Sequence, residues 1–396
     1  MRKIIALAGL SLLLPFTSQA RTLEDILVEK GIVTRNELAL VKEETAEEPV
    51  KIYWNEGSRV EFPDDGFTAR VYTKFRSRYE FIDNDGDVEN EDNFENTDLT
   101  LGIDGTALYN DFYYKFDANF AKDGSDMIED AYVQWQPCDN MYARLGQWRT
   151  EISRQSNTSS SKKQFLDDTV ASSIVDKGYL HGFGAGGDVL DGKIKFGASV
   201  RGGTSDGEGS NRPGIDNDVA GYAYARWDVL GEMDPFEEGD LANTEDLAIN
   251  VGTAYGYSDM NALGDVYADQ ALSADINLKY RGLSLAGEYF YDKLDAEITD
   301  DSADYNGFYV QAGYFVLPQQ LELASRFGYS DCDGGRMWGQ CAGNDNIKQA
   351  SVVANYYFWG QHLKAQVGYD MIQEKDASTR RNDNTNKWLV GVSTWW

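Results

Sequence analysis

From Gly66 to its last residue, the chain alternates between apolar and polar positions with a period of two. In "TARVYTKFRSRYEF" (68–81), the odd-numbered positions are mostly apolar and the even-numbered positions carry four cations. Successive side chains of a strand point to opposite faces, so this pattern predicts a strand with one apolar and one polar face. Similar segments, about sixteen in all, are expected at 67–82, 97–107, 110–121, 128–137, 140–150, 178–190, 192–202, 218–231, 244–258, 269–280, 283–292, 303–317, 320–331, 346–359, 361–373 and 385–396.

The connections between these segments alternate between short and long. Short ones such as "LPQ" (317–319) interleave with long polar ones such as "DKLDAEITDDSAD" (292–304). An even number of strands, with short turns at one end and long loops at the other, is typical of outer-membrane barrels made from one bacterial chain. The sequence therefore predicts an all-β fold, a transmembrane antiparallel β-barrel of about sixteen strands over residues 66–396, with both ends of the mature chain in the periplasm.

The first 65 residues differ from the rest of the chain. Arg2 and Lys3, an apolar stretch and the small residues of "SQA" predict a signal peptide over 1–20. The stretch "TLEDILVEKGIVTRNELALVKEE" (22–44) has two capping-box patterns with a glycine between them, which predicts a periplasmic helical hairpin over 21–48. Residues 49–65 are expected to form a linker. After residue 20, no apolar run approaches the roughly 20 residues of a transmembrane helix.

Positive charge is scarce in the chain and unevenly placed. There are 36 basic against 66 acidic residues, a net charge of −30, and the acidic excess lies mostly in the long loops. The apolar face of each strand must meet lipid, so the polar face lines the lumen. The candidate lumen residues are the cations on these polar faces: Arg70, Lys74, Arg76, Arg78, Lys115, Arg144, Lys195, Arg201, Arg226, Lys279 and Arg326.

Residues 149–177 form the longest predicted loop. Its first half holds Arg149, Arg154, Lys162 and Lys163 against a single acidic residue. A basic half-loop on an otherwise acidic outer face predicts a constriction loop folded into the barrel, where hydroxyl and guanidinium groups replace an anion's hydration. Two other interpretations remain open at this point: a flexible serine-rich surface loop, and a wet lumen whose cations merely brace the wall through ion pairs.

The predicted signal peptide exports the chain to an oxidising compartment, which favours a disulfide between two of its three cysteines. Cys332 and Cys341 flank a glycine-rich loop and are expected to form a disulfide. Cys138 is left over and is expected to be an unpaired turn residue. Three scattered cysteines do not make a zinc site, so no metal site is predicted.

No catalytic site or cofactor is expected. A serine–histidine hydrolase needs a general base, and the two histidines, His181 and His362, lie at a strand start and after a turn. The acidic loop "DNDGDVENED" (83–92) lacks the spacing of an EF-hand, which leaves weak binding of a divalent cation as its one metal interpretation.

Several stretches occur together: the signal peptide, the 22–44 stretch, the basic first strand, and "MIEDAYVQWQP" with "MYARLGQW" (127–148). In these the chain resembles the phosphate-selective porin O and P family of Gram-negative outer membranes, over essentially the whole mature chain. The resemblance implies a sixteen-stranded trimeric porin whose basic lumen takes phosphate and related anions. The family's acidic–Pro–Phe turn after "RLGQW" is replaced here by "RTEISRQSN" (149–157).

These observations predict an outer-membrane porin through which small inorganic or organic anions, such as phosphate, diffuse passively. The expected partners are those anions, outer-membrane lipid and lipopolysaccharide, and copies of the same chain in a homotrimer; no nucleic-acid partner is expected. Two alternatives remain: a general or cation-preferring porin, which the acidic excess favours, and a barrel that encloses a partner protein.

Overall fold

The computed structural model describes residues 30, 31, 34, 50–64, 66–84, 89–109, 111–202, 219–262, 265–296, 302–332, 341 and 343–396. The chain divides into two compact units, Met1–Pro49 and Val50–Trp396, and all the described strands lie in the second. The predicted signal peptide and nearly all of the predicted helical hairpin (21–48) lie outside the described residues. No helix in the described ranges is long and apolar enough to cross a membrane.

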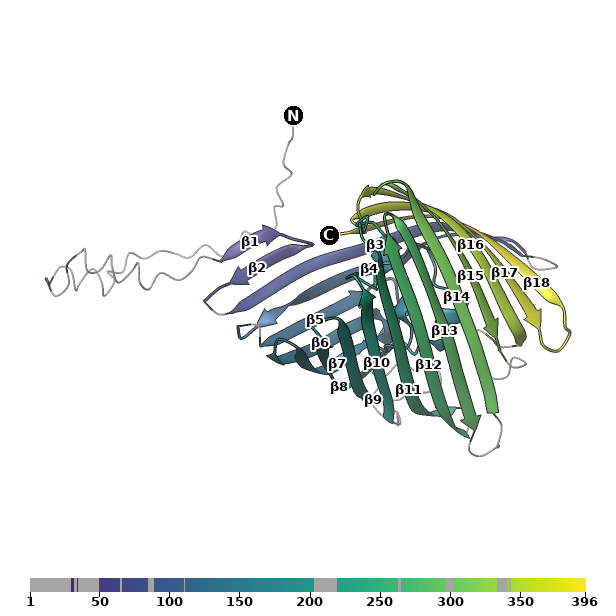
Figure 1. Ribbon diagram of the computed structural model, residues 1–396, viewed down its shortest axis with the longest axis horizontal. Helices are drawn as coiled ribbons and strands as arrows, with labels where there is room; N and C mark the ends of the chain where they lie inside the picture. Colours follow the sequence, from purple (N-terminus) through teal and green to yellow (C-terminus); the bar gives the residue numbers. More distant parts are fainter. Residues whose placement is uncertain are drawn as a thin grey trace. The chain divides into compact units, whose positions relative to one another are not determined.

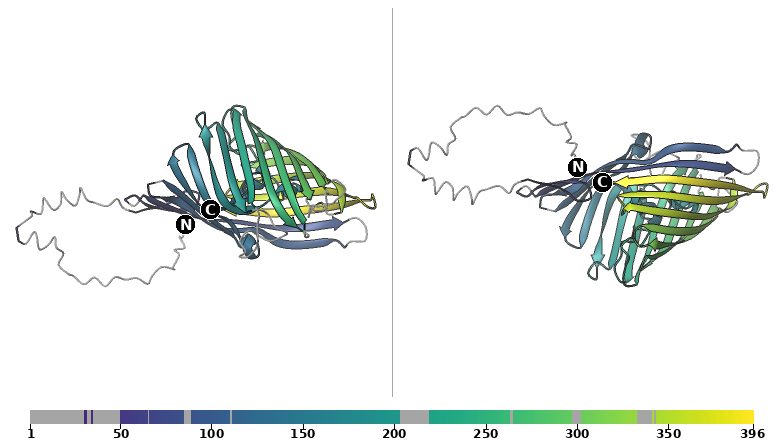
Figure 2. Two further views of the ribbon diagram at one scale, coloured as in Figure 1. Left: turned by 90° about the horizontal axis from the view of Figure 1, so that it is seen from below. Right: turned by 90° about the horizontal axis from the view of Figure 1, so that it is seen from above.

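Strands β3 to β18 form one antiparallel sheet in which each strand pairs with the next along the chain, and β18 pairs back with β3. Within the described ranges the sheet is therefore a closed barrel of sixteen strands, as predicted (Figures 1 and 2). The strands are β1 Lys51–Trp54, β2 Ser58–Phe62, β3 Phe67–Asn84, β4 Glu91–Ala107, β5 Phe112–Asn119, β6 Ile128–Cys138, β7 Met141–Arg149, β8 Tyr179–Val189, β9 Ile194–Gly202, β10 Val219–Leu230, β11 Ala248–Ala262, β12 Asp265–Tyr280, β13 Leu283–Ala296, β14 Ser302–Leu317, β15 Leu321–Asp331, β16 Asn344–Trp359, β17 Leu363–Asp376 and β18 Asn382–Trp395.

The predicted linker over 49–65 contains the two short strands β1 and β2. These two strands pair with each other, and β2 pairs with the first five residues of β3, up to Val71. β18 pairs with β3 only from Lys74 onward. Strand β2 therefore continues the sheet where β18 has ended, and Figure 1 shows both short strands beside the start of β3.

The two ends of the barrel differ in the length of their connections. At the turn end, most connections have two to four residues, such as 139–140 and 281–282. The loop end holds the longer ones, including 150–178 and 203–218. Each end has one exception: residues 231–247 join β10 to β11 at the turn end, and residues 263–264 join β11 to β12 at the loop end.

The barrel wall has an apolar outer face and a polar inner face. In β14, Val310 is 53% exposed, whereas its neighbours Tyr309 and Gln311 are almost completely buried. Phe327, Val352 and other large apolar side chains repeat this exposure on the neighbouring strands. Such a continuous apolar surface suits lipid, because a water-soluble protein seldom exposes apolar patches of this size.

The segment 150–178, which joins β7 to β8, lies inside the barrel and is called the lumen segment below. It holds three short helices: α3 Arg154–Asn157, η2 Ser160–Lys162 and α4 Val170–Val175. The Ser153 and Thr169 side chains cap α3 and α4 by accepting hydrogen bonds from backbone N–H groups. Most residues from 152 to 175 are buried. A fourth short helix, η1 Gly124–Met127, lies in the β5–β6 connection at the loop end.

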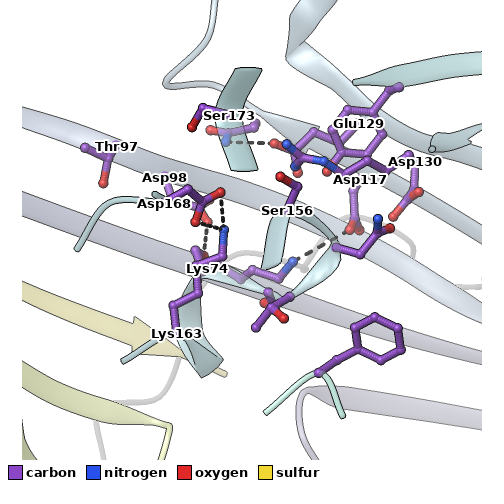
Figure 3. A pocket seen from close by; sticks show the side chains of 18 of the residues that line it. Lys74, Thr97, Asp98, Asp117, Glu129, Asp130, Ser156, Lys163, Asp168 and Ser173 are labelled. Carbon is purple, nitrogen blue, oxygen red and sulfur yellow. Dashed lines mark hydrogen bonds and ion pairs between the residues drawn. The ribbon is translucent and has the colours of Figure 1, made fainter. Parts of the chain in front are cut away.

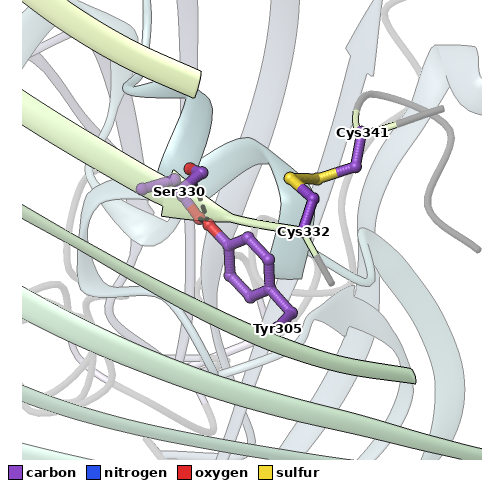
Figure 4. The surroundings of a disulfide bond; sticks show 5 residues. Tyr305, Ser330, Cys332 and Cys341 are labelled. Atoms are coloured by element: carbon purple, nitrogen blue, oxygen red, sulfur yellow. Dashed lines mark hydrogen bonds between the residues drawn. A yellow bond between two sulfur atoms is a disulfide. The ribbon is translucent and has the colours of Figure 1, made fainter. Parts of the chain in front are cut away.

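Cys332 and Cys341 form the predicted disulfide. Both are almost completely buried, in a cluster that includes Ala171 and Ile174 of α4. In Figure 4, Tyr305 lies beside the disulfide; its hydroxyl donates to the Ala171 carbonyl at 3.1 Å. The disulfide is thereby part of the packing that holds α4 against the wall. Cys138 is free and exposed.

Replacing both Cys332 and Cys341 with serine is expected to leave the barrel intact and to lower its free energy of unfolding. The closed loop is short, so the loss should be about 2–3 kcal/mol at most. Urea unfolding of the lipid-reconstituted protein, followed by tryptophan fluorescence, measures the loss. A variant that no longer forms a barrel would contradict this expectation.

Candidate functional site: the lumen

A cavity of about 1000 Å³ lies inside the barrel, between the lumen segment and the wall formed mainly by β3 to β10. Among its lining residues, eleven are basic and eight are acidic, a net charge of +3. The basic residues are Lys74, Arg76, Arg78, Lys115, Lys122, Arg144, Arg149, Lys163, Lys195, Arg226 and Lys387, and the acidic ones are Asp98, Asp117, Glu129, Asp130, Glu151, Asp167, Asp168 and Asp370. The lining is therefore positive in a chain whose net charge is −30.

Nine of the fifteen cations predicted from the sequence line this cavity. The other six are outside its lining: Arg70, Arg201, Lys279 and Arg326 on strands of the wall, and Arg154 and Lys162 in the lumen segment. Two lining cations, Lys122 and Lys387, were missed by the sequence reasoning. Lys122 follows the predicted strand 110–121 and was therefore assigned to a loop. Lys387 lies in the predicted strand 385–396 but was not named as a lumen residue.

Most lining cations are paired with carboxylates. Figure 3 shows two such pairs, Lys74 with Asp117 at 3.8 Å and Lys163 with Asp168 at 2.5 Å. The first pair joins β3 to β5, and the second pair lies within the lumen segment. Most positive charges of the lumen are thus neutralised by a neighbouring carboxylate, and few remain uncompensated.

Arg78 and Arg149 have the tightest carboxylate contacts. Arg78 bonds Asp167 of the lumen segment and Glu95 of β4, the latter at 2.5 Å, and Arg149 bonds Asp176. Burial alone would raise the pKa of Asp167 and of Asp176, but the guanidinium beside each carboxyl lowers that pKa below its ordinary value. Both carboxylates therefore stay ionised at neutral pH and neutralise their arginines.

Four lining cations form no ion pair with any carboxylate of the described residues: Arg76, Arg144, Lys195 and Lys387. Arg144 donates from Nε and Nη2 to Gln134 Oε1, at 3.1 and 2.8 Å. Lys195 projects from β9 and is exposed toward the cavity. Without these four residues the lining would have seven bases and eight acids, a net charge of −1.

Cations of the wall also hold the backbone of the lumen segment. Arg76 donates from Nη2 to the Phe165 carbonyl at 3.1 Å. Arg326 and Lys364 donate to three further carbonyl oxygens between residues 161 and 167, at 2.7–3.0 Å. Buried carbonyls need such donors because the segment has little regular structure of its own. The sequence reasoning missed Lys364, and it expected Arg76 to attract anions or to brace the wall through ion pairs, not to bind backbone carbonyls.

Carboxylates supply the complementary contacts to backbone N–H groups. Glu288 of β13 accepts from the backbone N–H of Arg154 at 2.7 Å and of Gln155 at 3.3 Å. Glu238 accepts from the N–H of Gln164 at 2.7 Å. Charged side chains thus bind both the N–H groups and the carbonyl oxygens of the lumen segment's backbone.

The wall behind the lumen segment is acidic. On the inner face of β12 to β17, the buried charged side chains outside the cavity lining are five acids and three bases: Asp269, Asp275, Glu288, Asp292 and Glu322, with Lys279, Arg326 and Lys364. The segment packs against much of this wall, through contacts with β13 to β15 among others. It therefore separates an acidic half of the barrel from the cavity with the positive lining.

The connection 231–247 enters the turn end of the barrel and contacts the lumen segment. The Glu238 N–H donates to the Lys162 carbonyl at 3.2 Å, and Arg154 donates to the Pro235 carbonyl at 3.2 Å. The sequence reasoning did not assign this role to it. Its unusual length for a turn, together with the charged run "DPFEEGD" (234–240), was the available signal.

The remaining candidates for chemistry lie apart from the cavity. His362 is at the turn end, where its ring stacks on Trp395 with centroids 4.9 Å apart. Among the described residues, no group of histidine, cysteine, aspartate or glutamate side chains is arranged to hold a metal. The acidic loop 83–92 includes residues outside the described ranges, so its weak divalent site stays a prediction.

Comparisons with solved structures show that this barrel is a porin fold. OmpT of Vibrio cholerae in its trimer form has a TM-score of 0.57 and 12% identity, covering 83% of this chain and 99% of OmpT. The channel DcaP of Acinetobacter baumannii has a TM-score of 0.58 and 12% identity, covering 84% and 98%. An anion-selective porin from Comamonas acidovorans has a TM-score of 0.59 and 11% identity, covering 83% and 100%.

The sequence itself places the chain in a family. No curated protein matches it at a significant level. The family of phosphate-selective porins O and P matches residues 70–392, which is most of the barrel. Family and fold are those of channels rather than of enzymes. The chain belongs to the phosphate-selective porin O and P family and is a β-barrel porin of the outer membrane.

Proposed function

We propose that this porin lets small anions, phosphate among them, diffuse passively across the outer membrane. The observation that carries the proposal is the charge of the cavity lining, +3 in a chain of −30. Rings and clusters of Arg and Lys in a pore favour anions. A solved barrel of similar fold is an anion-selective porin, so this fold is compatible with anion passage.

The position of the positive charge matters more than the total charge of the chain. At physiological salt the field of the acidic loops decays over about 8 Å, whereas an ion in the cavity is much closer to Arg144 and Lys195. The lumen segment narrows the barrel on one side, and we place the constriction there. An ion passing the segment then moves along the wall of β3 to β10, where the lining cations gather.

The reversal potential in a salt gradient tests this proposal. The wild-type channel in a planar bilayer is expected to prefer chloride over potassium, and Lys195→Gln is expected to reduce that preference. Lys348→Gln is the matched control: it removes the same charge from an exposed position on the outer face of β16 and should change nothing. A cation-preferring wild-type channel would overturn the proposal and favour the general-porin alternative.

We further propose that the porin is a homotrimer whose turn end faces the periplasm and whose long loops meet lipopolysaccharide. The trimer form of OmpT supports the first point for this fold. Short periplasmic turns and long outer loops are the rule for such barrels, which supports the second. Chemical cross-linking in isolated outer membranes distinguishes a trimer from a monomer.

A further inference from the structure

Two tyrosines meet over two glycines on the inner face of β7 to β10. Tyr142 pairs in register with Gly186, Gly186 with Gly197, and Gly197 with Tyr224. The two tyrosine hydroxyls are 3.2 Å apart, so the rings together bridge the four strands. Both tyrosines line the cavity. We call this surface the tyrosine strip.

The glycines are required for the rings to lie on the sheet. A Cβ atom at Gly186 would be 2.6 Å from the Tyr142 hydroxyl oxygen, and one at Gly197 would be 2.6 Å from Cε1 of Tyr224. Any other residue would push the rings away from the wall. The two rings of the tyrosine strip therefore form a flat aromatic surface that lies directly on the backbone of β8 and β9.

Arg144 lies at one end of this surface, one inward position along β7 from Tyr142. Its guanidinium carbon is 4.3 Å from the centre of the Tyr132 ring and 5.2 Å from the centres of the Tyr142 and Trp148 rings. Nε and Nη2 share one acceptor, Gln134 Oε1. Nη1 donates to no atom of the described residues, and no described carboxylate forms an ion pair with this guanidinium.

This arrangement offers two kinds of contact to one ligand. The faces of the guanidinium lie near aromatic rings, which leaves its open edge for an anionic group, and arginine binds carboxylates through such an edge. A planar apolar body attached to that group would lie on the neighbouring ring of Tyr142, where offset or edge-to-face contacts are favourable. A small hydrated anion would use the guanidinium alone.

We propose that Arg144 and the tyrosine strip form a binding site for aromatic carboxylates within the channel. The proposal rests on the anion-preferring function above and narrows its substrate class. The carboxylate binds the free edge of Arg144, and the ring of the ligand lies against Tyr142. Lys195 supplies further positive charge and makes no cation–π contact with a described ring, so it attracts anions without selecting for a ring.

Block of the chloride current by added benzoate tests the site. Benzoate is expected to reduce the single-channel current in a saturable way, and cyclohexanecarboxylate, which has the same charge but a non-planar ring, should do so less. Tyr142→Leu is expected to weaken the benzoate block by about fivefold, the scale of one aromatic contact. Tyr142→Phe keeps the ring and should behave as the wild type. Arg144→Gln should abolish the block.

The Lys195→Gln channel separates this inference from the proposed function. It should show a lower preference for chloride over potassium and the same preference for benzoate over cyclohexanecarboxylate. Equal block by the two carboxylates in an anion-selective wild-type channel would overturn the aromatic site and leave the anion porin standing. A cation-selective wild-type channel would overturn both. An unchanged benzoate block in Tyr142→Leu would also refute the site.

Discussion

Replacing residues 151–177 with Asn-Gly is expected to raise the single-channel conductance on the order of twofold and to weaken the preference for anions. Sixteen-stranded barrels enclose an aqueous channel when nothing fills them. Here the lumen segment occupies one side of that space. Its removal joins the existing cavity to the space in front of β12 to β17.

The strands on either side of the lumen segment tolerate this replacement. Arg149 and Tyr179 are already paired in the β7–β8 ladder, and the Thr150 N–H donates to the Gly178 carbonyl at 2.9 Å. The ends of the segment are thus adjacent, and Asn-Gly favours a two-residue hairpin turn between antiparallel strands. The closed barrel needs no other change.

The change in ion preference follows from what the segment covers. Residues 151–177 contain four basic and four acidic residues, so the chain keeps its net charge when they are removed. The wall that becomes accessible has five acidic and three basic side chains on β12 to β17. An ion in the widened channel therefore meets an acidic surface that the segment had kept from it.

Reversal potentials and conductance measured on the same channels check both parts of this prediction. Adding Glu288→Gln and Glu322→Gln to the deletion is expected to restore part of the anion preference and to keep the high conductance. Because the two substitutions remove acidic groups of the exposed wall, this comparison separates the effect of wall charge from the effect of channel width. A deletion channel with an unchanged anion preference would show that the wall behind the segment does not influence selectivity.

The alternation of apolar and polar residues was enough to predict the barrel, because a strand in a membrane barrel has one face in lipid and one in the lumen. The same alternation placed Arg78 and Arg226 correctly on the inner face. It did not distinguish a cation that lines the cavity from one that holds the lumen segment. Arg76 and Arg78 are two residues apart on the same face, yet Arg76 bonds backbone carbonyls and Arg78 bonds carboxylates.

The partner of each inward side chain depends on contacts between elements far apart in the chain. Lys364 of β17 contacts residues 161 and 163, about two hundred positions earlier. Glu238 contacts the same segment from a connection at the turn end. A period-two pattern carries no information about such pairs, because it specifies only the face of a residue within its own strand. The division of the lumen into a positive and an acidic half therefore emerged only from the structure.

Arg154→Met is expected to lower the free energy of unfolding by about 3–5 kcal/mol, because it breaks a buried ionic contact from one side. Arg154 is fully buried and donates to Tyr309 and to the Pro235 carbonyl, with Asp275 3.8 Å away. Glu288 accepts from the backbone N–H of residue 154, and the Arg154 guanidinium is also an attractive charge for this carboxylate. Methionine fills a similar volume but supplies no charge.

Lys162→Met is the matched control in the same segment. Lys162 pairs with Asp234 at 2.7 Å, but the two side chains are 34% and 41% exposed, and such pairs contribute about 0–1 kcal/mol. Denaturant unfolding of both reconstituted variants measures the difference. Equal losses in the two variants at neutral pH would mean that Arg154 is not the ionic link between the lumen segment, the wall and the turn-end connection.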